Sequence, residues 1–430
     1  MRFTTLDQWL NWQASLHPRE IELGLTRCHI VARRLNLLHP QFPIISVAGT
    51  NGKGSSVILL DAILAASGYR VGRYTSPHLL RYNERICIAG QEATEVELCY
   101  AFELIDQARD EVSLTFFEFA TLAAMFLFQK HHVDVAVLEV GLGGRLDAVN
   151  IFDCDIALVT AIDIDHVDWL GTDRESIGLE KAGIFRSQRP AVCSDPNPPL
   201  SLIQYAQQLH VPLFYPDRDF TYHKESENTW SWRFLNPSTL LSKIDIDFSH
   251  LPRPHLLGDF QLQNAAGVLM VLNLLSEQLI FSQTALNQGL INAFLPGRFQ
   301  VLPGKITRIL DVAHNPLGAK VLTRLLHQYP GQGQTHAIIG MLEDKDIAAF
   351  LTIMQDSITH WHLAPLNTPR TATVQCLVDK LSDLGVTRIY SYSSITNAYS
   401  HLLSHLHHPD RIVICGSFYT VYEVMRLETM

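Results

Sequence analysis

The stretch that decides the fold is Ala48-Gly49-Thr50-Asn51-Gly52-Lys53-Gly54-Ser55-Ser56. It follows FPIISVA (42–48), a run rich in β-branched residues, and it opens a helical pattern from Ser55 to Ser67. Glycines at such a junction let backbone N–H groups approach phosphate oxygens, and the helix N-terminus adds partial positive charge. Strand, glycine loop and helix together predict a phosphate-binding loop in an α/β protein.

The side chains of this loop support nucleotide binding. Lys53 is placed to reach the β- and γ-phosphates, and the Ser55 hydroxyl to reach the shell of a bound metal ion. A glycine separates the lysine from the hydroxyl, so the loop departs from the general Walker pattern. An ordinary glycine-rich turn is the alternative, which explains the lysine and the two hydroxyls less well. The predicted nucleotide contacts are Thr50, Asn51, Gly52, Lys53, Gly54 and Ser55.

Around this loop, apolar strand-like runs alternate with helical patterns. Strands are expected at 71–74, 134–140 and 155–162, and helices at 95–110, 116–130, 173–185 and 262–277. Continuous apolar runs mark parallel strands covered on both faces, so the succession predicts a doubly wound, mostly parallel sheet. Between 215 and 262 the pattern changes, and TWSWRF (229–234) and IDIDF (244–248) predict small strands or hairpins.

A second domain is predicted after Phe294. Two Pro-Gly pairs, at 296–297 and 303–304, interrupt the chain there. Strands are then expected at 306–313, 336–341, 388–392 and 411–417, and helices at 316–328, 346–357, 372–384 and 395–406. We therefore predict an N-terminal domain at 1–294 and a smaller, Rossmann-like α/β domain at 295–430.

Composition narrows the class of partner. The chain has 430 residues, 47% of them hydrophobic, and 33 basic against 43 acidic residues give a net charge of −10. That balance disfavours nucleic acid, because neutralising phosphates needs clustered positive charge. Seven scattered cysteines without a CxxC pair are typical of reduced, buried thiols rather than a zinc or disulfide scaffold. With no secretory signal and no apolar run near ~18 residues, we expect a cytoplasmic protein without a membrane partner.

Polar side chains follow the ends of three strands. Glu139 closes an otherwise apolar strand, Asp163-Ile164-Asp165-His166 follows the next, and Ser76 follows an earlier one. Open α/β sheets bind ligands at the carboxyl ends of their strands. Hard oxygen ligands with one imidazole fit Mg²⁺, or Mn²⁺ in its place, better than zinc. The alternatives are a helix-capping role for Glu139, a polar loop role for His166, and a solvated helix position for Lys181.

Nine motifs, in this order along the whole chain, resemble a known family. They are SVAGTNGKGS (46–55), TSPHL (75–79), LEVGLGGRLDAVN (138–150), DHVDWLG (165–171), EKAGIFR (180–186), LPGRF (295–299), DVAHNP (311–316), GMLEDKD (340–346) and CGSF (415–418). Together they are similar to the folylpolyglutamate synthases of the Mur ligase superfamily. The set is far more specific than any single member.

The resemblance implies an ATP-dependent amide ligase that uses L-glutamate. It implies a P-loop ATPase-like N-terminal domain, an active site in the interdomain cleft, and a monomer. It further implies that the metal ligands are Ser76, Glu139 and His166, and that Lys181 is carbamylated. The implied nucleotide contacts outside the loop are Asn264, Arg298 and Asp311. His314 is expected either to assist the amine or the incoming glutamate, or to be a loop-packing histidine.

The acid to be activated is expected to be 7,8-dihydropteroate or a reduced folate. A pterin needs an apolar wall and a carboxylate facing its amidine edge. Thr115-Phe116-Phe117-Glu118 and Leu146-Asp147-Ala148 offer both, and the resemblance adds Ile21-Glu22-Leu23. The two phenylalanines also fit core side chains at a helix start. Phe117 and Asp147 are the preferred contacts.

Three other functions stay open at this point. A ligase acting on a cell-wall nucleotide precursor is disfavoured, because no obvious UDP-binding domain precedes the phosphate loop at Gly49. A regulatory module that uses ATP as a switch would not need the metal ligands. A small-molecule kinase would not need glutamate.

Overall fold

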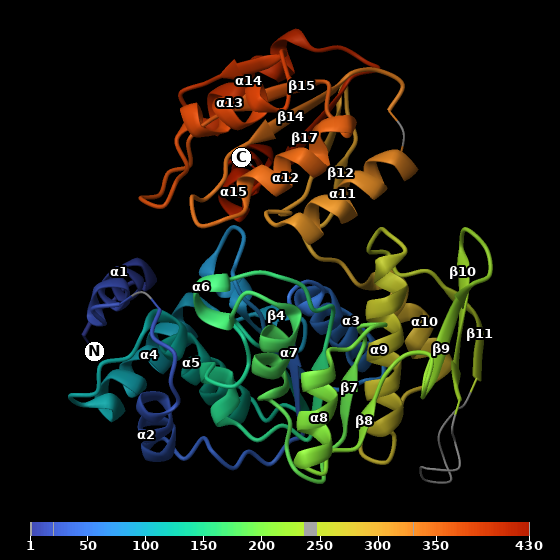
Figure 1. Ribbon diagram of the computed structural model, residues 1–430. Helices are drawn as coiled ribbons and strands as arrows, with labels where there is room; N and C mark the ends of the chain where they lie inside the picture. Colours follow the sequence, from blue (N-terminus) through green and yellow to red (C-terminus); the bar gives the residue numbers. More distant parts are fainter. Residues whose placement is uncertain (1, 20, 236–246, 330, 430) are drawn as a thin grey trace. The chain divides into compact units, whose positions relative to one another are not determined.

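The computed structural model describes residues 2–19, 21–235, 247–329 and 331–429 (Figure 1). The chain divides into two compact units. Unit 1 comprises Met1–His255 and Asp259–Phe294, and unit 2 comprises Leu256–Gly258 and Leu295–Met430. The main change of unit therefore falls between Phe294 and Leu295.

Unit 1 is built on an eight-stranded sheet in the order β4-β3-β2-β5-β1-β6-β7-β8. Its strands are β1 (Ile44–Ala48), β2 (Val71–Tyr74), β3 (Ile86–Ile88), β4 (Gln91–Glu92), β5 (Val135–Glu139), β6 (Ile156–Val159), β7 (Ala191–Cys193) and β8 (Leu213–Phe214). Neighbouring strands pair in parallel, except that β3 is antiparallel to both β2 and β4. Every residue of β1, β5 and β6 is buried, as continuous apolar runs predict for strands covered on both faces.

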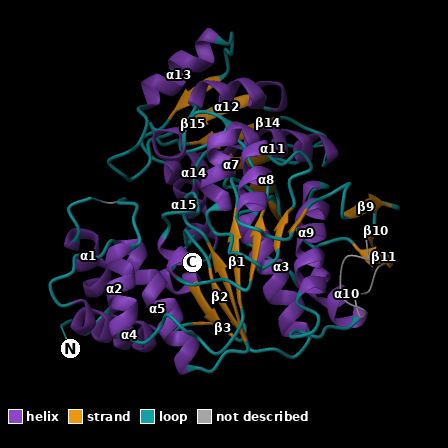
Figure 2. Cartoon of the chain, turned by 60° about the horizontal axis from the view of Figure 1, so that its bottom comes forward, coloured by secondary structure: helices purple, strands orange, loops and turns teal. Residues whose placement is uncertain are grey.

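Helices cover both faces of this sheet. Figure 2 shows α3, α9 and α10 on one side and α1, α2, α4 and α5 on the other. The helices of unit 1 are α1 (Leu6–Leu16), α2 (Thr26–Arg34), α3 (Lys53–Ala66), α4 (Glu95–Arg109), α5 (Phe116–Lys130), α6 (Val167–Leu170), α7 (Arg174–Ala182), α8 (Leu200–Gln208), α9 (Phe260–Leu274) and α10 (Gln283–Asn292). Two 3₁₀ turns, η1 (Tyr82–Arg85) and η2 (Ala148–Ile151), complete the unit.

A small antiparallel sheet accounts for the unusual composition of residues 215–262. It contains β9 (Phe220–Lys224), β10 (Thr229–Phe234) and β11 (Asp247–Pro252), in the order β11-β10-β9. Helix α9 packs against β6 and β7 of the main sheet and against β9 and β10 of the small one. Apolar residues therefore occur on every side of α9, together with the buried amides Gln261, Asn264 and Asn273. Residues 244–246 of the predicted IDIDF strand lie outside the described residues.

Unit 2 holds a six-stranded sheet in the order β12-β13-β17-β14-β15-β16, parallel except for β12. The strands are β12 (Gln300–Leu302), β13 (Thr307–Leu310), β14 (Thr335–Ile339), β15 (His360–Leu363), β16 (Ile389–Ser391) and β17 (Arg411–Cys415). The helices are α11 (Pro316–Gln328), α12 (Ile347–Met354), α13 (Val374–Asp383), α14 (Ile395–His405) and α15 (Phe418–Glu428), with a 3₁₀ turn η4 (Gln355–Ser357). This alternation confirms the predicted Rossmann-like class.

Sequence analysis missed several elements and placed the ends of others too far along the chain. Strand β15 was missed because its sequence, HWHL, lacks a recognisable apolar pattern. Two of its histidines stack with His336 of β14, and His336 Nδ1 lies 3.1 Å from His362 Nε2. The helices predicted at 173–185, 262–277 and 346–357 end earlier, at Ala182, Leu274 and Met354. Elements α1, α2, α6, α8, α10, α15, β3, β4, β7, β8 and β12 were also not predicted.

Two expectations from composition can be compared with the structure. All seven cysteines are free thiols, and only Cys376 is not fully buried. Within the described ranges, none of the helices combines the length and the apolar character needed to cross a bilayer.

Candidate active site

The phosphate loop lies between β1 and α3. Gly49 and Gly52 have φ angles of 153° and 93°. A Cβ at Gly49 would lie 1.8 Å from Thr160 Oγ1, and one at Gly52 would lie 2.5 Å from Asn264 Oδ1. Both positions require glycine because the backbone conformation and the close neighbours exclude a side chain.

Strand β6 and the segment after it hold the loop in place. The Thr50 N–H donates to the Ala161 carbonyl at 2.8 Å. The Thr160 hydroxyl donates to the Asn51 carbonyl at 2.8 Å. The Thr50 hydroxyl donates to the Asp163 carbonyl at 2.9 Å. These bonds fix the turn from outside and leave the start of α3 available to a phosphate group.

Lys53 is the first residue of α3, and its side chain folds back over the loop. Its Nζ donates to the carbonyls of Gly49 (2.9 Å) and Thr50 (3.2 Å). The ammonium group therefore lies directly above the turn, where phosphate oxygens can replace these carbonyls. This is the position that the loop motif predicts for the lysine.

A buried amide network joins the loop to α9. Ser55 is buried, and its Oγ accepts a hydrogen bond from Gln261 Nε2 at 3.3 Å. Gln261 Oε1 in turn accepts from Asn264 Nδ2 at 2.9 Å, and Asn264 lies against Gly52. The predicted residue Asn264 thus lies at the loop. Sequence analysis missed Gln261, although its spacing of three residues places it on the same face of α9.

Ser76, Glu139 and His166 follow strands whose carboxyl ends share one sheet edge. Glu139 is buried at the end of β5, and its Oε2 accepts the Ser76 N–H at 3.1 Å. His166 caps α6 with φ of 50°, is exposed, and has its Nε2 4.0 Å from Asp165 Oδ2. Strand β1 lies between β5 and β6, so the segments bearing Glu139 and His166 follow strands on either side of the loop strand.

These donors fit a magnesium ion held jointly with phosphates. Among the described residues, no three His, Cys, Asp or Glu side chains gather as a ready metal cluster. Mg²⁺ does not need one, because it commonly takes one or two protein carboxylates together with substrate phosphates and waters. A buried carboxylate beside the loop strand matches that requirement, whereas zinc would need more nitrogen or sulfur ligands. The Glu139 carboxylate holds the chain after β2 through the Ser76 N–H.

Lys181 is buried in α7, so its interpretation as a solvated helix lysine is wrong. Burial and, to a smaller extent, the nearby charge of Lys53 lower the pKa of Lys181 to about 7, and Asp165 opposes this change. Lys181, Lys53 and Asp165 therefore share one electrostatic environment. Near neutral pH a large share of the Lys181 amine carries no charge.

The glycine-rich segment after β5 positions α7. The Arg145 N–H donates to the Glu180 carbonyl at 2.9 Å, and Asn150 Nδ2 donates to the Gly183 carbonyl at 3.0 Å. A Cβ at Gly144 would lie 2.7 Å from the Glu180 carbonyl oxygen. The motifs that contain Arg145 and Lys181 therefore form one packed unit.

In unit 2, Asp311 follows β13 and is held by backbone groups. Its carboxylate accepts the N–H groups of Phe299 and Ala313, each at 2.8 Å. Burial raises the pKa of Asp311, and the charge of Arg298 opposes that rise. The two predicted nucleotide contacts of this unit are thus close to each other.

Phe418 joins the same group and was missed by sequence analysis as a site residue. The Arg298 guanidinium lies 5.2 Å from the Phe418 ring centroid, and the His314 ring centroid lies 6.0 Å from it. His314 Nδ1 is 2.9 Å from the Val312 carbonyl oxygen. The sequence did contain a signal for Phe418, because this residue is the last of the CGSF motif.

Phe117 and Asp147 meet at Gly141. A Cβ at Gly141 would lie 2.7 Å from Phe117 Cζ and 3.3 Å from Asp147 Oδ2. Phe117 is half-buried and its ring centroid lies 5.9 Å from that of Tyr74. The structure therefore brings the two preferred pterin contacts together, with one aromatic face and one carboxylate.

Asp147 is buried and also has a structural task. It caps η2 by accepting the Val149 N–H at 3.0 Å, and it accepts the Leu142 N–H at 2.8 Å. Burial raises the pKa of Asp147 to about 6, against the lowering effect of these hydrogen bonds and of Lys53. Its protonation state thus changes near neutral pH.

Glu22, Arg27, Thr115 and Glu118 form a group that we call the Glu22–Glu118 cluster. Arg27 Nη1 lies 2.7 Å from Glu22 Oε1, and Arg27 Nη2 lies 3.2 Å from Glu118 Oε1. Thr115 and Glu118 form a capping box at the start of α5, with N–H to side-chain bonds of 2.7 and 3.2 Å. Sequence analysis named Glu22, Thr115 and Glu118 but missed Arg27, which connects them.

The other predicted pterin contacts lie around these groups. Phe116 is half-buried, 5.5 Å from Tyr82 between ring centroids and 5.4 Å from the Arg85 guanidinium. The Leu146 carbonyl accepts the Gly24 N–H at 3.1 Å, which ties 146–148 to the 21–25 segment. Ala148 is buried, and Ile21 and Leu23 are half-buried.

Two family profiles match the sequence. The Mur ligase middle domain matches residues 47–272, and the glutamate ligase domain of Mur ligases matches residues 297–418. The chain belongs to the Mur ligase family. The predicted family and fold class are thereby confirmed.

Relatives of this Mur ligase match over nearly its whole length. It is 42% identical to the dihydrofolate synthase/folylpolyglutamate synthase of Escherichia coli (strain K12), with 98% of this chain and 95% of that protein covered. The solved structure of E. coli FolC in complex with DHPP and ADP has a TM-score of 0.91 at 41% identity, and 99% and 98% of the two chains are covered. A solved bifunctional folylpolyglutamate synthase/dihydrofolate synthase with Mn, AMPPNP and L-glutamate bound has a TM-score of 0.90 at 43% identity, with 99% and 98% covered.

Proposed function

We propose that this Mur ligase joins L-glutamate to 7,8-dihydropteroate, making dihydrofolate, and adds further glutamates to reduced folates, with conversion of ATP to ADP and phosphate. The observation that carries the proposal is the phosphate loop with Lys53 folded over it. The chain is similar along its length to bifunctional dihydrofolate synthase/folylpolyglutamate synthases. The relatives solved with ADP, or with AMPPNP, Mn and L-glutamate, support ATP, a divalent cation and glutamate as ligands.

The chemistry follows from what the loop can do. A carboxylate is a poor acyl donor, so its oxygen first attacks the γ-phosphorus and displaces ADP. Lys53 and the N–H groups at the start of α3 offset the negative charge that spreads over the γ-phosphate oxygens. The glutamate amine then attacks the acyl carbon of the resulting acyl phosphate. The amide forms, phosphate leaves with the former carboxylate oxygen, and the amine loses a proton.

Ser76, Glu139 and His166 are the residues that would hold the divalent cation. When bound, Mg²⁺ or Mn²⁺ supplies positive charge to the phosphate oxygens and orients them. Gln261 positions Ser55 at the loop through its hydrogen bond of 3.3 Å. In the C-terminal unit, Asp311 and Arg298 contribute nucleotide contacts, and His314 assists the amine or the incoming glutamate.

Lys181 is suited to carbamylation by its environment. A neutral amine adds to carbon dioxide to form a carbamate and releases one proton. Burial and Lys53 lower the pKa of Lys181 to about 7, so the reactive neutral amine is present near neutrality. The product is an anion, and its charge is favourable beside the Lys53 ammonium.

The pterin is proposed to lie on Phe117 with its amidine edge toward Asp147. The flat ring of the pterin suits the half-buried aromatic face, and the carboxylate accepts hydrogen bonds from the donor edge. The Glu22–Glu118 cluster fixes the segment that carries Phe117, because Thr115 and Glu118 cap the same helix.

Product mass spectrometry tests the function. The purified protein is incubated with Mg-ATP and L-glutamate, with 7,8-dihydropteroate in one reaction and tetrahydrofolate in the other. We expect one added glutamate in both products, with ADP released. Addition to tetrahydrofolate alone would contradict the dihydrofolate synthase activity and the pterin site at Phe117 and Asp147. A phosphorylated acid without any glutamate would identify a kinase instead.

A further inference from the structure

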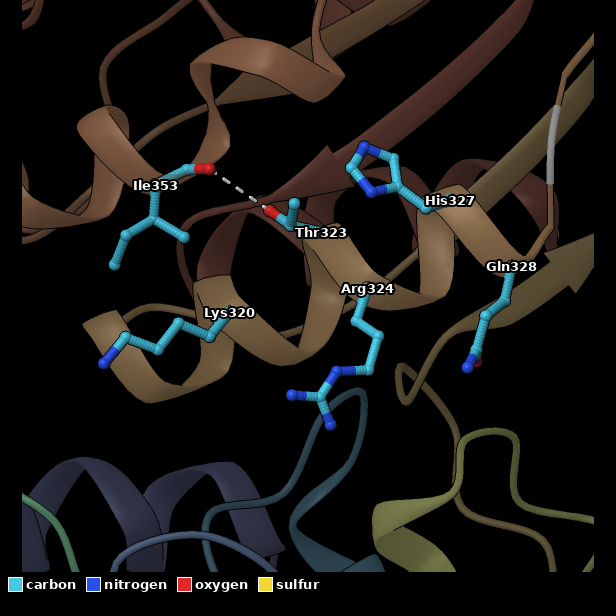
Figure 3. Close-up of a pocket in the computed structure, with 6 residues that line it drawn as sticks. All are labelled: Lys320, Thr323, Arg324, His327, Gln328 and Ile353. Carbon is cyan, nitrogen blue, oxygen red and sulfur yellow. Dashed lines mark hydrogen bonds between the residues drawn. The ribbon is translucent and has the colours of Figure 1, made fainter.

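Helix α11 carries an exposed row of polar and positive side chains in unit 2. Lys320, Arg324 and Gln328 extend from one side of the helix at intervals of four residues (Figure 3). They line a surface hollow of about 530 Å³. The rest of the lining consists of Thr323, His327 and Ile353. The hollow contains no acidic side chain, although the chain as a whole has a net charge of −10.

The two cations of this row are available to a ligand. Across the described residues, neither Lys320 nor Arg324 has an ion-pair or hydrogen-bond partner through its side chain. Other arginines of unit 2 are paired: Arg370 lies 2.8 Å from Asp344, and Arg308 lies 3.1 Å from Glu428. Two unpaired cations one helical turn apart, without a nearby carboxylate, produce a local positive field that attracts anions.

The opposite side of the hollow is fixed. Thr323 Oγ1 donates to the Ile353 carbonyl of α12 at 3.4 Å, and His327 Nε2 lies 3.2 Å from Ser357 Oγ. These contacts tie α11 to α12 and η4, so the row of Lys320 and Arg324 stands on a rigid base. The spacing of the cations is therefore set by the helix itself.

We propose that this hollow binds the γ-linked glutamate tail of a folate through the free α-carboxylates of the tail. The inference rests on the proposed function, since only a folate that has already received glutamate carries such a tail. Each γ-linked residue leaves one α-carboxylate unbonded. The tail is therefore a polyanion with one regularly repeated charge.

The repeat of the tail matches the repeat of the helix. An extended γ-linked residue has five backbone atoms instead of three, which gives a charge repeat of about 6 Å. Side chains four residues apart on a helix are also separated by about 6 Å along the axis. Two successive carboxylates can thus pair with Lys320 and Arg324, and a third can accept the Gln328 amide N–H. The flexible, exposed cations suit a chain of carboxylates better than one compact phosphate.

The proposal predicts a difference between substrates of the same enzyme. Dihydropteroate has no glutamate and cannot use the hollow, whereas a tetrahydrofolate with four γ-linked glutamates can use all of it. The test variant is K320Q/R324Q, which removes both cations. The matched control is K305Q/R388Q, which removes two exposed cations of unit 2 outside the hollow.

We expect K320Q/R324Q to raise the KM for the tetraglutamate substrate about fivefold to tenfold, as two exposed charge pairs allow. The kcat/KM for dihydropteroate should stay within about twofold, the control variant should leave both substrates unchanged, and added salt should reduce the difference. An unchanged KM for the tetraglutamate substrate, or an equal loss with dihydropteroate, would overturn the proposal.

A binding measurement that needs no catalysis separates this proposal from the proposed function. Free γ-linked tetraglutamate is titrated into the wild-type chain and into both variants, with calorimetric detection. We expect binding that K320Q/R324Q weakens and the control does not. Absence of binding, equal binding of α-linked tetraglutamate, or tighter binding of inorganic triphosphate would overturn the proposal. Failure of the wild type to add glutamate to any acid would instead overturn the proposed function.

Discussion

Side chains have different tasks in the phosphate loop and at the proposed pterin site of unit 1, which comprises Phe117, Asp147 and the Glu22–Glu118 cluster. The loop is held mainly by backbone groups and by Thr160, and the Lys53 ammonium donates to the carbonyls of Gly49 and Thr50. On the pterin side, Asp147 caps η2 and the Glu22–Glu118 cluster caps α5. Binding and folding are therefore separable at the loop, whereas the same side chains serve both on the pterin side.

The largest effect is expected at the loop. Lys53→Ala should lower ATP-dependent turnover with either acid about a thousandfold or more, because it removes the cation facing the γ-phosphate. Unfolding by urea should change little, since the hydrogen bonds from Thr160 and from the backbone that hold the loop stay in place. Release of ADP with each acid measures the first effect. Turnover close to that of the wild type would refute the assignment of the loop.

Substitution of Asp147 is expected to impair the reaction of one acid substrate more than that of the other. Asp147→Ala should lower kcat/KM for dihydropteroate about a hundredfold, as lost hydrogen bonds to a charged acceptor allow. The loss for a tetrahydrofolate substrate should be smaller by about tenfold. Steady-state kinetics with both acids tests this, and Asp147→Asn serves as the variant of similar shape. Equal losses with both acids would remove the reason for placing the pterin there.

The same residue should make the stability of the fold depend on pH. Burial raises the pKa of Asp147 from 3.8 to about 6, so between these values the folded chain binds the proton and the unfolded chain does not. The contribution of Asp147 to the free energy of unfolding is therefore most favourable below pH 3.8 and is lost as the pH rises through about 6. Relative to Asp147→Asn, the wild type should lose about 2 to 3 kcal/mol across this window.

Urea unfolding of both proteins at a series of pH values measures this difference. Lys53→Ala should extend this window to higher pH, because the charge of Lys53 lowers the pKa of Asp147 and the substitution removes it. A constant difference between wild type and Asp147→Asn would show that Asp147 is already ionised throughout.

The smallest effect is expected in the capping box of α5. Thr115→Ala removes the hydroxyl that accepts the Glu118 N–H at 3.2 Å. We expect it to lower the free energy of unfolding by about 1 kcal/mol, as is usual for a lost helix cap, and to leave kcat within about threefold. Thr94→Ala, in the capping box of α4, is the matched control away from the pterin side. A large loss of dihydropteroate turnover without a loss of stability would show that Thr115 contacts substrate directly.

The sequence predicted the features that are encoded in a few consecutive residues or that lie at the ends of strands. Lys53 and its loop follow from a strand, two glycines and a helix start, and Glu139 follows from its place at the end of an apolar strand. Both signals lie within a few residues, so no knowledge of distant contacts is needed. The order of elements in each unit follows from the same alternation.

What the sequence did not predict depends on contacts between distant segments. Arg27 joins Glu22 to Glu118, and Arg27 and Glu118 are 91 residues apart along the chain. Gln261 contacts Ser55, which is 206 residues away from it along the chain. No local pattern marks either partner. The burial of Lys181 is similar, because the segment around Gly144 and Arg145 covers α7.

The most direct test of acyl-phosphate formation follows a single oxygen atom. The acid substrate is prepared with oxygen-18 in the carboxylate that reacts, and the phosphate released during glutamate addition is analysed by mass spectrometry. The account predicts one oxygen-18 atom in each released phosphate, because the carboxylate oxygen that attacks the γ-phosphorus leaves with it. Phosphate without the label, with the second labelled oxygen atom found in AMP or in water, would contradict it.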